Sequence, residues 1–144
     1  MKNLVIIGSG GHTRSVISAT NLIGKWNIIG IVDIDFNGNE EYINNIRVTN
    51  LEKLLSQIIP SETDAVISVG DNLKRLDVFD KVKDVGLTFP NIIHPRSFVD
   101  ESAKIGFGNY VGQFANIGAY SQIGYFNLIN TYANVEHEVA IGDF

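Results

Sequence analysis

A Val or Ile occurs at every sixth residue through the last third of the chain. The eight positions are Val99, Ile105, Val111, Ile117, Ile123, Ile129, Val135 and Ile141. Neither an α-helix, with a period of 3.6, nor an ordinary strand, with a period of 2, demands this spacing. A parallel β-helix does, because each hexad supplies one short strand and one turn, and the stacked aliphatic side chains fill a narrow prism.

Small residues flank the aliphatic position of the repeat. The residue two places before it is Ala103, Asn109, Ala115, Ser121, Asn127 or Ala133, and the residue after it is Gly106, Gly112, Gly118, Gly124 or Gly142. A glycine there suits a turn that needs a positive φ or a close approach of two backbones. The eight hexads run from residue 97 to residue 144 without a capping segment. Because the ends of a solenoid normally need caps, we expect the chain to be a fragment or a truncated product.

The residues before the repeat alternate between strand and helix patterns. We expect strands over residues 2–7, 26–32, 64–69 and 88–93, and helices over 13–23, 51–59 and 73–85. This alternation predicts a parallel α/β sheet. The sequence thus predicts a Rossmann-like α/β domain over residues 1–93 and a β-helix domain, incomplete at its C-terminal end, over residues 97–144. His94 and Pro95 mark the junction, where Pro95 fixes the path of the chain.

Charge and composition exclude several classes of protein. The formal net charge of −5 argues against a nucleic-acid surface, and the absence of cysteine excludes disulfides and a cysteine nucleophile. We expect no metal site. The apolar run at residues 4–7 is too short for a signal peptide, and no segment approaches the length of a membrane span. We therefore expect a soluble, cytoplasmic protein with neither a nucleic-acid nor a membrane partner.

A glycine-rich segment, Gly8-Ser9-Gly10-Gly11-His12, lies between the first strand and the first helix. Glycines let the backbone approach a phosphate there, and the helix N-terminus supplies N–H donors. The dinucleotide fingerprint is incomplete, because Thr13 holds its third glycine position. Asp33 ends the second strand, where such a domain places its ribose carboxylate. The residues leave open an NAD site, a site for a nucleotide-linked sugar, and an ordinary glycine turn.

A second polar segment, Gly70-Asp71-Asn72, follows the third strand. Open α/β sheets bind ligands outside the carboxyl ends of their strands, so we expect Gly10, Asp33 and Gly70 to converge on one edge. Asp71 or Asn72 would also cap the following helix well, and the two roles are compatible.

The third candidate segment is Asn134-Val135-Glu136-His137-Glu138. His137 lies two residues after the inward Val135, so we expect it on the outer wall of the prism. A histidine suits a general base near neutral pH, and a carboxylate at Glu136 or Glu138 could orient it. The alternative is a solvated surface histidine.

Many outward positions of the repeat are aromatic: Phe107, Tyr110, Phe114, Tyr120, Tyr125, Phe126 and Tyr132. Exposed apolar clusters indicate an interface, such as three prisms packed side by side. The alternative is aromatic stacking along one wall of a monomer.

Together these segments resemble the bacterial sugar acyltransferases typified by sialic acid O-acetyltransferase (NeuD-like) and UDP-4-amino-sugar N-acetyltransferase (PglD-like). The resemblance covers the whole chain through VIIGSGGH, IVDIDF, ISVGDN, NIIHP and, most specifically, NTYANVEHEVAIGDF. It implies a left-handed β-helix with three hexads per turn and a homotrimer.

The resemblance also implies roles for individual residues. His137 would be the general base that takes a proton from a sugar amine or hydroxyl as it attacks acetyl-CoA, and Glu138 would tune His137. Gly10, Gly11, His12, Asp33 and Gly70 match positions that hold the sugar nucleotide. The acetyl-CoA pocket would be built largely from later coils and a neighbouring subunit.

Three functions follow from these observations. The leading hypothesis is an acetyl-CoA-dependent N- or O-acetyltransferase acting on a bacterial surface-sugar precursor, either a nucleotide-linked amino sugar or sialic acid. The second is a non-catalytic sugar-nucleotide-binding or scaffold module left by truncation. The third is an NAD-dependent enzyme, suggested only by the glycine-rich segment and Asp33.

Overall fold

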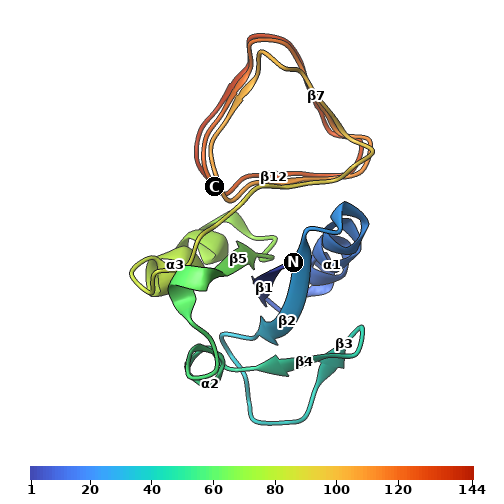
Figure 1. Cartoon of the computed structure of the whole chain (residues 1–144). Coiled ribbons are helices and arrows are strands. Elements are labelled where there is room, and N and C mark those ends of the chain that lie inside the picture. The colour runs from blue at the N-terminus through green and yellow to red at the C-terminus, as the bar shows by residue number, and fades with distance from the viewer.

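The N-terminal part of the chain forms a five-stranded sheet in the order β3-β4-β2-β1-β5, with every pair parallel except β3 and β4 (Figure 1). The computed structural model describes all residues from 1 to 144. The strands are β1 (Lys2–Ile7), β2 (Trp26–Val32), β3 (Tyr42–Ile43), β4 (Ile46–Thr49) and β5 (Thr63–Ile67). The expected parallel α/β sheet is confirmed, and β3 adds an antiparallel edge.

Both faces of this sheet are covered, because successive residues of a strand point to opposite sides. Leu4 and Ile6 of β1 pack with α1 (Gly11–Ile23), whereas Val5 and Ile7 pack with residues of α2 (Leu51–Leu55) and α3 (Asn72–Val82). Gly24 ends α1 in the left-handed conformation, as its sequence position predicts. None of the helices combines the length and the apolar composition that crossing a bilayer requires.

Several element boundaries differ from the sequence prediction. The hairpin of β3 and β4 was not expected, because each strand is short and the turn between them, Asn44-Asn45, lacks glycine although both residues have positive φ. The helix expected over residues 51–59 ends at Leu55, and a single 3₁₀ turn at Pro60–Glu62 precedes β5. The strand expected over 88–93 is wrong as one element: Thr88 makes one bridge to Asp64, whereas β6 (Ile92–Ile93) pairs with the prism.

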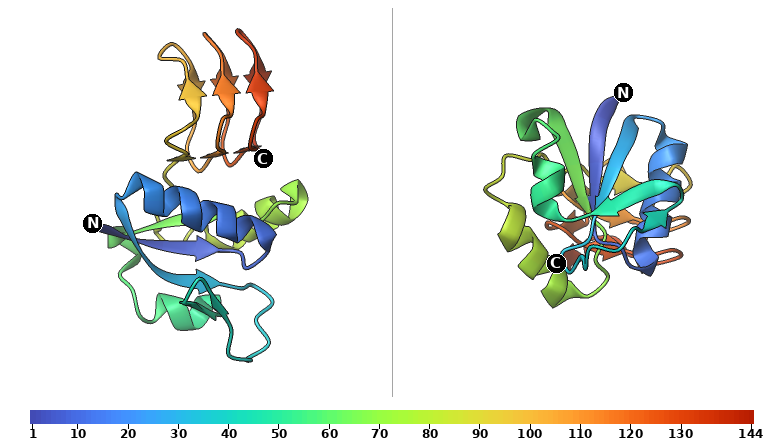
Figure 2. Two further views of the ribbon diagram at one scale, coloured as in Figure 1. Left: turned by 90° about the vertical axis from the view of Figure 1, so that its right-hand side faces the viewer. Right: turned by 90° about the horizontal axis from the view of Figure 1, so that it is seen from below.

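The C-terminal part is a left-handed parallel β-helix of two-residue strands. Partners lie 18 residues apart, as in the pair Asn116 and Asn134, so three hexads complete one turn. The three faces are β6-β9-β12, β7-β10-β13 and β8-β11-β14, and Figure 2 shows the coils stacked side by side. The strands are β7 (Phe98–Val99), β8 (Lys104–Ile105), β9 (Tyr110–Val111), β10 (Asn116–Ile117), β11 (Gln122–Ile123), β12 (Leu128–Ile129), β13 (Asn134–Val135) and β14 (Ala140–Ile141).

The aliphatic column fills the prism, and of the two roles expected for the glycines that follow it, the close approach of backbones is the one observed. The residues with positive φ come three places after each aliphatic residue, not directly after it, and most are aromatic: Gly108, Phe114, Tyr120, Phe126, Tyr132, Glu138 and Phe144. A Cβ would meet nothing within 4 Å at Gly142, but Gly106, Gly112, Gly118 and Gly124 serve close approach. A Cβ on Gly118, for example, would lie 2.8 Å from the His137 backbone nitrogen of the next coil.

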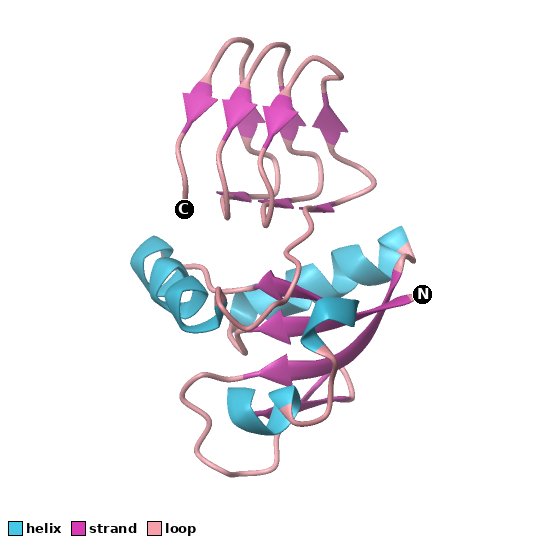
Figure 3. Cartoon of the chain, turned by 60° about the vertical axis from the view of Figure 1, so that its left-hand side comes forward, coloured by secondary structure: helices cyan, strands magenta, loops and turns pink.

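One face of the prism, β6-β9-β12, packs against the N-terminal part over α1 and α3, and we call it the docked face (Figures 1 and 3). Ile92 and Tyr110 join the apolar core under α1, and Phe126 joins the core against α3. Tyr110 is 4% exposed and Phe126 is 1% exposed, so these two aromatic residues cover an internal junction rather than an outer wall. The other five outward aromatic residues are exposed, as expected.

Candidate functional site

The glycine-rich segment forms one wall of a cavity of about 340 Å³ at the carboxyl ends of β1 and β5. We call it the glycine cavity. It is lined by Gly8, Ser9, Gly10, Gly11, His12, Ser68, Val69, Gly70, Asp71 and Lys74. The structure therefore brings together Gly10, Gly11, His12, Gly70 and Asp71, which the sequence proposes as substrate-binding residues.

The turn before α1 is held in place by two buried hydroxyls. Thr13 Oγ1 donates to the Gly8 carbonyl at 2.8 Å and lies 2.8 Å from Ser68 Oγ. Gly8 has φ 124°, and a Cβ there would lie 2.7 Å from Ser68 Oγ, so this position requires glycine. Thr13, which breaks the dinucleotide fingerprint, thus ties the first strand to β5.

Asp33 lies beside the glycine cavity rather than in it. Its carboxylate accepts hydrogen bonds from Ser9 Oγ at 2.7 Å and from the Asp35 N–H at 2.8 Å. It lines a neighbouring cavity of about 260 Å³, whose walls also include Lys74 and Lys81. The convergence of Gly10, Asp33 and Gly70 on one sheet edge is thus observed in the structure.

In the segment after β5, Asp71 and Asn72 make different contacts. Asp71 caps α3 by accepting a hydrogen bond from the Lys74 N–H at 2.9 Å, and it also lines the glycine cavity. The Asn72 side chain does not line that cavity, because its Oδ1 accepts a hydrogen bond from Arg75 Nη2 at 2.8 Å. Arg75 is a residue that sequence reasoning missed, since a single arginine in a helix pattern predicts a solvated face.

His12 joins the glycine cavity to the docked face. Its ring meets the Tyr110 ring edge to face, with centroids 4.7 Å apart. Burial, and secondarily the charge of Arg75, lowers the pKa of His12 below its usual value. Its Nε2 is buried without a hydrogen-bond partner. A neutral imidazole with one unpaired nitrogen can accept a hydrogen bond from a ligand in the cavity or donate one to it.

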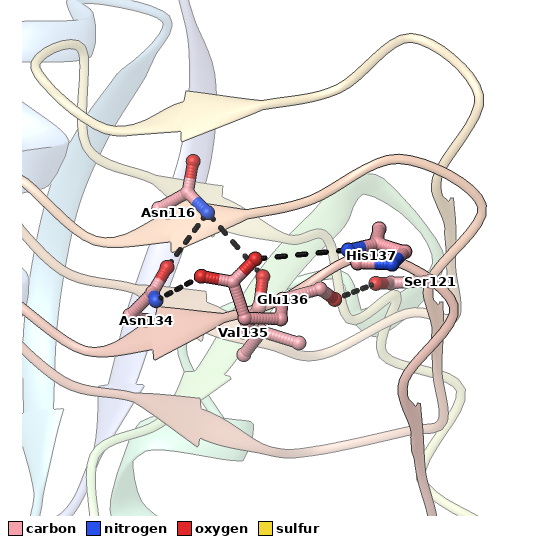
Figure 4. A network of polar contacts seen from close by, with 6 residues as sticks. All are labelled: Asn116, Ser121, Asn134, Val135, Glu136 and His137. Atoms are coloured by element: carbon pink, nitrogen blue, oxygen red, sulfur yellow. Dashed lines mark hydrogen bonds and ion pairs between the residues drawn. The ribbon is translucent and has the colours of Figure 1, made fainter.

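His137 lies at the corner between β13 and β14, opposite the docked face, and Figure 4 shows its surroundings. We call this turn the His137 corner. The imidazole is 71% exposed, as its spacing from Val135 predicts. Its Nδ1 faces Glu136 Oε2 at 3.8 Å, which is an ion-pair distance rather than a hydrogen bond.

A short polar chain fixes Glu136 (Figure 4). Asn116 Nδ2 donates to Asn134 Oδ1 at 2.9 Å, and Asn134 Nδ2 donates to Glu136 Oε1 at 2.7 Å. Ser121 Oγ donates to the Glu136 carbonyl at 2.7 Å. The hydrogen bond from Asn134, together with the proximity of His137, lowers the pKa of the Glu136 carboxyl. Glu136 is therefore held as a carboxylate beside the imidazole.

Glu138, which the resemblance implies as the tuning acid, is held in the structure through its backbone. It has φ 59°, and its N–H donates to the Ala119 carbonyl at 2.8 Å. The structure shows no ion pair or side-chain hydrogen bond between Glu138 and His137; Glu136 faces the imidazole instead. Neither here nor elsewhere in the chain does a group of three or more His, Cys, Asp or Glu residues have an arrangement that could hold a metal ion.

The chain matches a family model and a curated protein. The model of the PglD N-terminal domain matches residues 3–82, more than half of the chain. UDP-N-acetylbacillosamine N-acetyltransferase of Bacillus subtilis is 31% identical over an alignment of 116 residues that covers 77% of this chain. The chain spans about half, 51%, of the length of that relative.

Solved structures are similar over nearly the whole chain. The acetyltransferase domain of PglB from Neisseria gonorrhoeae, in complex with acetyl coenzyme A, has a TM-score of 0.87 at 28% identity, covering 98% of this chain and 67% of its own. A histidine-to-alanine variant of GDP-perosamine N-acetyl transferase from Caulobacter crescentus, in complex with CoA and GDP-perosamine, has a TM-score of 0.87 at 30% identity. It covers 99% of this chain and 66% of its own.

Proposed function

The chain belongs to the family of the PglD N-terminal domain, and from this membership we propose that it acts in an acetyl-CoA-dependent acetyltransferase for a nucleotide-linked amino sugar. The relatives described above are named N-acetyltransferases, which favours an amine over a hydroxyl as the acceptor. O-acetylation, for which sialic acid is the candidate acceptor, is the alternative. The cytoplasm, as the sequence predicts, is the proposed compartment.

The observation that carries this proposal is His137, exposed on the prism beside a fixed carboxylate. Because Nδ1 faces Glu136 and the imidazole is exposed, Nε2 is the nitrogen left to accept a proton from an acceptor amine. The Glu136 carboxylate stabilises the imidazolium that results. Glu138, which the resemblance implies as the tuning acid, is kept as the alternative to Glu136 for this role.

The proposed reaction is a direct transfer. Acetyl-CoA supplies the thioester carbonyl, and the exposed His137 corner leaves room for such a group to approach from solvent. The acceptor nitrogen forms a bond to the carbonyl carbon, the carbon–sulfur bond breaks, and the proton passes through His137 to the leaving thiolate. No covalent acyl-enzyme is needed, since the chain has no cysteine.

We assign the acceptor to the glycine cavity and its neighbour, in the part proposed as the domain of residues 1–93. Gly10, Gly11, Gly70 and Asp71 would face the diphosphate, and His12 and Asp33 would bind polar groups of the nucleotide sugar. Asn72, proposed from the sequence for the same site, would act only through Arg75.

The placement of the two sites supports a homotrimer. The glycine cavity borders the docked face through His12 and Tyr110, whereas His137, in the proposed domain of residues 97–144, lies at the opposite corner of the prism. A substrate held in the cavity of one chain is therefore better placed to meet His137 of another copy.

Calorimetric titration with UDP-4-amino-sugar, GDP-amino-sugar, CMP-sialic acid, NAD and acetyl-CoA tests the acceptor assignment, and a transfer assay of His137→Ala tests the base. We expect a nucleotide amino sugar to bind and kcat of His137→Ala to fall at least ~100-fold. Glu101→Ala is the control. Glu101 is exposed and lies in the same column of the prism as Ala119 and His137, two turns away from His137. Binding without any transfer would favour the non-catalytic module, and binding of NAD alone would contradict the sugar site.

A further inference from the structure

Arg75 is a buried guanidinium on which the Asp71 carboxylate acts only from beyond ion-pair distance. It is 2% exposed, and it takes part in none of the ion pairs of the chain. Its position on α3 places it behind the glycine cavity, whose lining it does not join. Burying a charged group costs free energy unless its N–H donors form hydrogen bonds. The hydrogen bonds of Arg75 therefore indicate its role.

All contacts of Arg75 go to oxygen atoms of two segments. Nη1 donates to the carbonyls of Val69 at 2.8 Å and Gly70 at 3.1 Å, and Nη2 donates to Asn72 Oδ1. Nε donates to the Phe126 carbonyl at 2.7 Å, in the coil that packs against α3. The planar guanidinium therefore joins the loop after β5 to the prism.

These contacts fix the direction of two peptide groups. Across a trans peptide bond, the carbonyl of one residue and the N–H of the next point in opposite directions, and the chain has no cis bond. Since the carbonyls of Val69 and Gly70 point to Arg75, the N–H groups of Gly70 and Asp71 point away from it. Neither N–H donates a hydrogen bond within the chain, and both residues line the glycine cavity.

We infer that Arg75 is a positioning residue that turns the Gly70 and Asp71 amides toward the glycine cavity, so that they bind the diphosphate of the substrate opposite Gly10 and Gly11. This inference rests on the proposed function for the identity of the ligand. Successive free amides in a loop form a cradle for anions, and the N-terminus of α1, at Gly10 and Gly11, lines the same cavity. The positive charge of Arg75 behind the loop strengthens the same attraction.

Arg75→Lys tests the inference, because it keeps the charge but loses the planar arrangement of donors. We expect the Kd for UDP or GDP, whichever the chain binds, to rise ~10–100-fold, while the Kd for uridine or guanosine changes less than about 2-fold. Lys83→Gln, which removes an exposed charge just after the same helix, should leave both values unchanged. An unchanged Kd for the diphosphate in Arg75→Lys would overturn the inference.

Amide NMR of the unaltered chain with pyrophosphate gives a readout that does not depend on the variant's folding. We expect the Gly70 and Asp71 N–H resonances to shift together with those of Gly10 and Gly11. In Arg75→Lys, only the amides of Gly10 and Gly11 should still shift with pyrophosphate, whereas a general loss of structure would affect all four amide resonances. Absent shifts at Gly70 and Asp71 in the unaltered chain would overturn the inference. Shifts with pyrophosphate but no binding of any nucleotide would overturn the proposed function alone.

Discussion

The glycine cavity and the His137 corner are built in opposite ways. The cavity is shaped by backbone that contacts between distant segments hold in place, such as Thr13 with Ser68 and Arg75 with Phe126. The His137 corner is an exposed turn that neighbouring coils align through their repeat. The comparison indicates that the proposed binding site is organised within one chain, whereas the proposed base lies on a surface that a second molecule can approach.

The largest effect is expected from Gly8→Ala, which attacks the backbone of the cavity. A positive φ and a Cβ 2.7 Å from Ser68 Oγ should together cost about 2–4 kcal/mol of unfolding free energy. Urea unfolding measures this loss. Gly10→Ala is the matched control, because its φ is ordinary and its Cβ would meet nothing within 4 Å. Equal stability of the two variants would show that the cavity backbone is not held as described.

A smaller loss is expected from Gly118→Ala at the His137 corner. The added Cβ would lie 2.8 Å from the His137 backbone nitrogen, so neighbouring coils must separate, at about 1–3 kcal/mol. Gly142→Ala is the control in the same place of the hexad, since its Cβ would be free. We expect acetyl transfer to fall in Gly118→Ala but not in Gly142→Ala. Transfer unaffected by Gly118→Ala would mean that the coil spacing does not position His137.

The half-buried His12 at the glycine cavity should make the free energy of unfolding depend on pH. Its pKa is lowered in the folded chain, so protons bind more tightly to the unfolded chain. The stability due to neutral His12 is therefore present above the ordinary pKa of 6.5 and is lost as the pH falls below it. Urea unfolding between pH 7.5 and about 5 should show a steeper loss for the unaltered chain than for His12→Gln. His137→Gln provides the control at the exposed corner, and a flatter curve for this variant than for His12→Gln would contradict the prediction.

The smallest effect is expected from Asn134→Ala. The substitution removes the hydrogen bond that lowers the pKa of the Glu136 carboxyl, so that pKa should rise toward its ordinary value. Carboxyl carbon NMR of Glu136 measures the change. Stability should change by less than about 0.5 kcal/mol, because the contact is exposed. A pKa that stays low would show that His137 rather than Asn134 controls this carboxylate.

Local chemistry explains why much of the fold could be predicted. The first three sheet strands of the prediction, α1 with its stop at Gly24, and the prism with its aliphatic interior follow from patterns that operate within a few residues. The glycine residues of the cavity were found for the same reason, since a strand, a glycine turn and a helix in succession have one geometry. The β3–β4 hairpin was missed because its strands are too short to show a period.

The sequence by itself determined the six-residue repeat, the inward aliphatic column, the exposed place of His137 and the sheet edge where Gly10, Asp33 and Gly70 meet. Only the tertiary structure decided that Glu136 rather than Glu138 faces His137, that Tyr110 and Phe126 lie inside the junction, and that Arg75 is buried behind the cavity. The physical reason is range. A repeat specifies which way each side chain leaves the backbone, whereas contacts such as Asn116 with Asn134, 18 residues apart, and Arg75 with Phe126, 51 residues apart, exist only after the chain has folded.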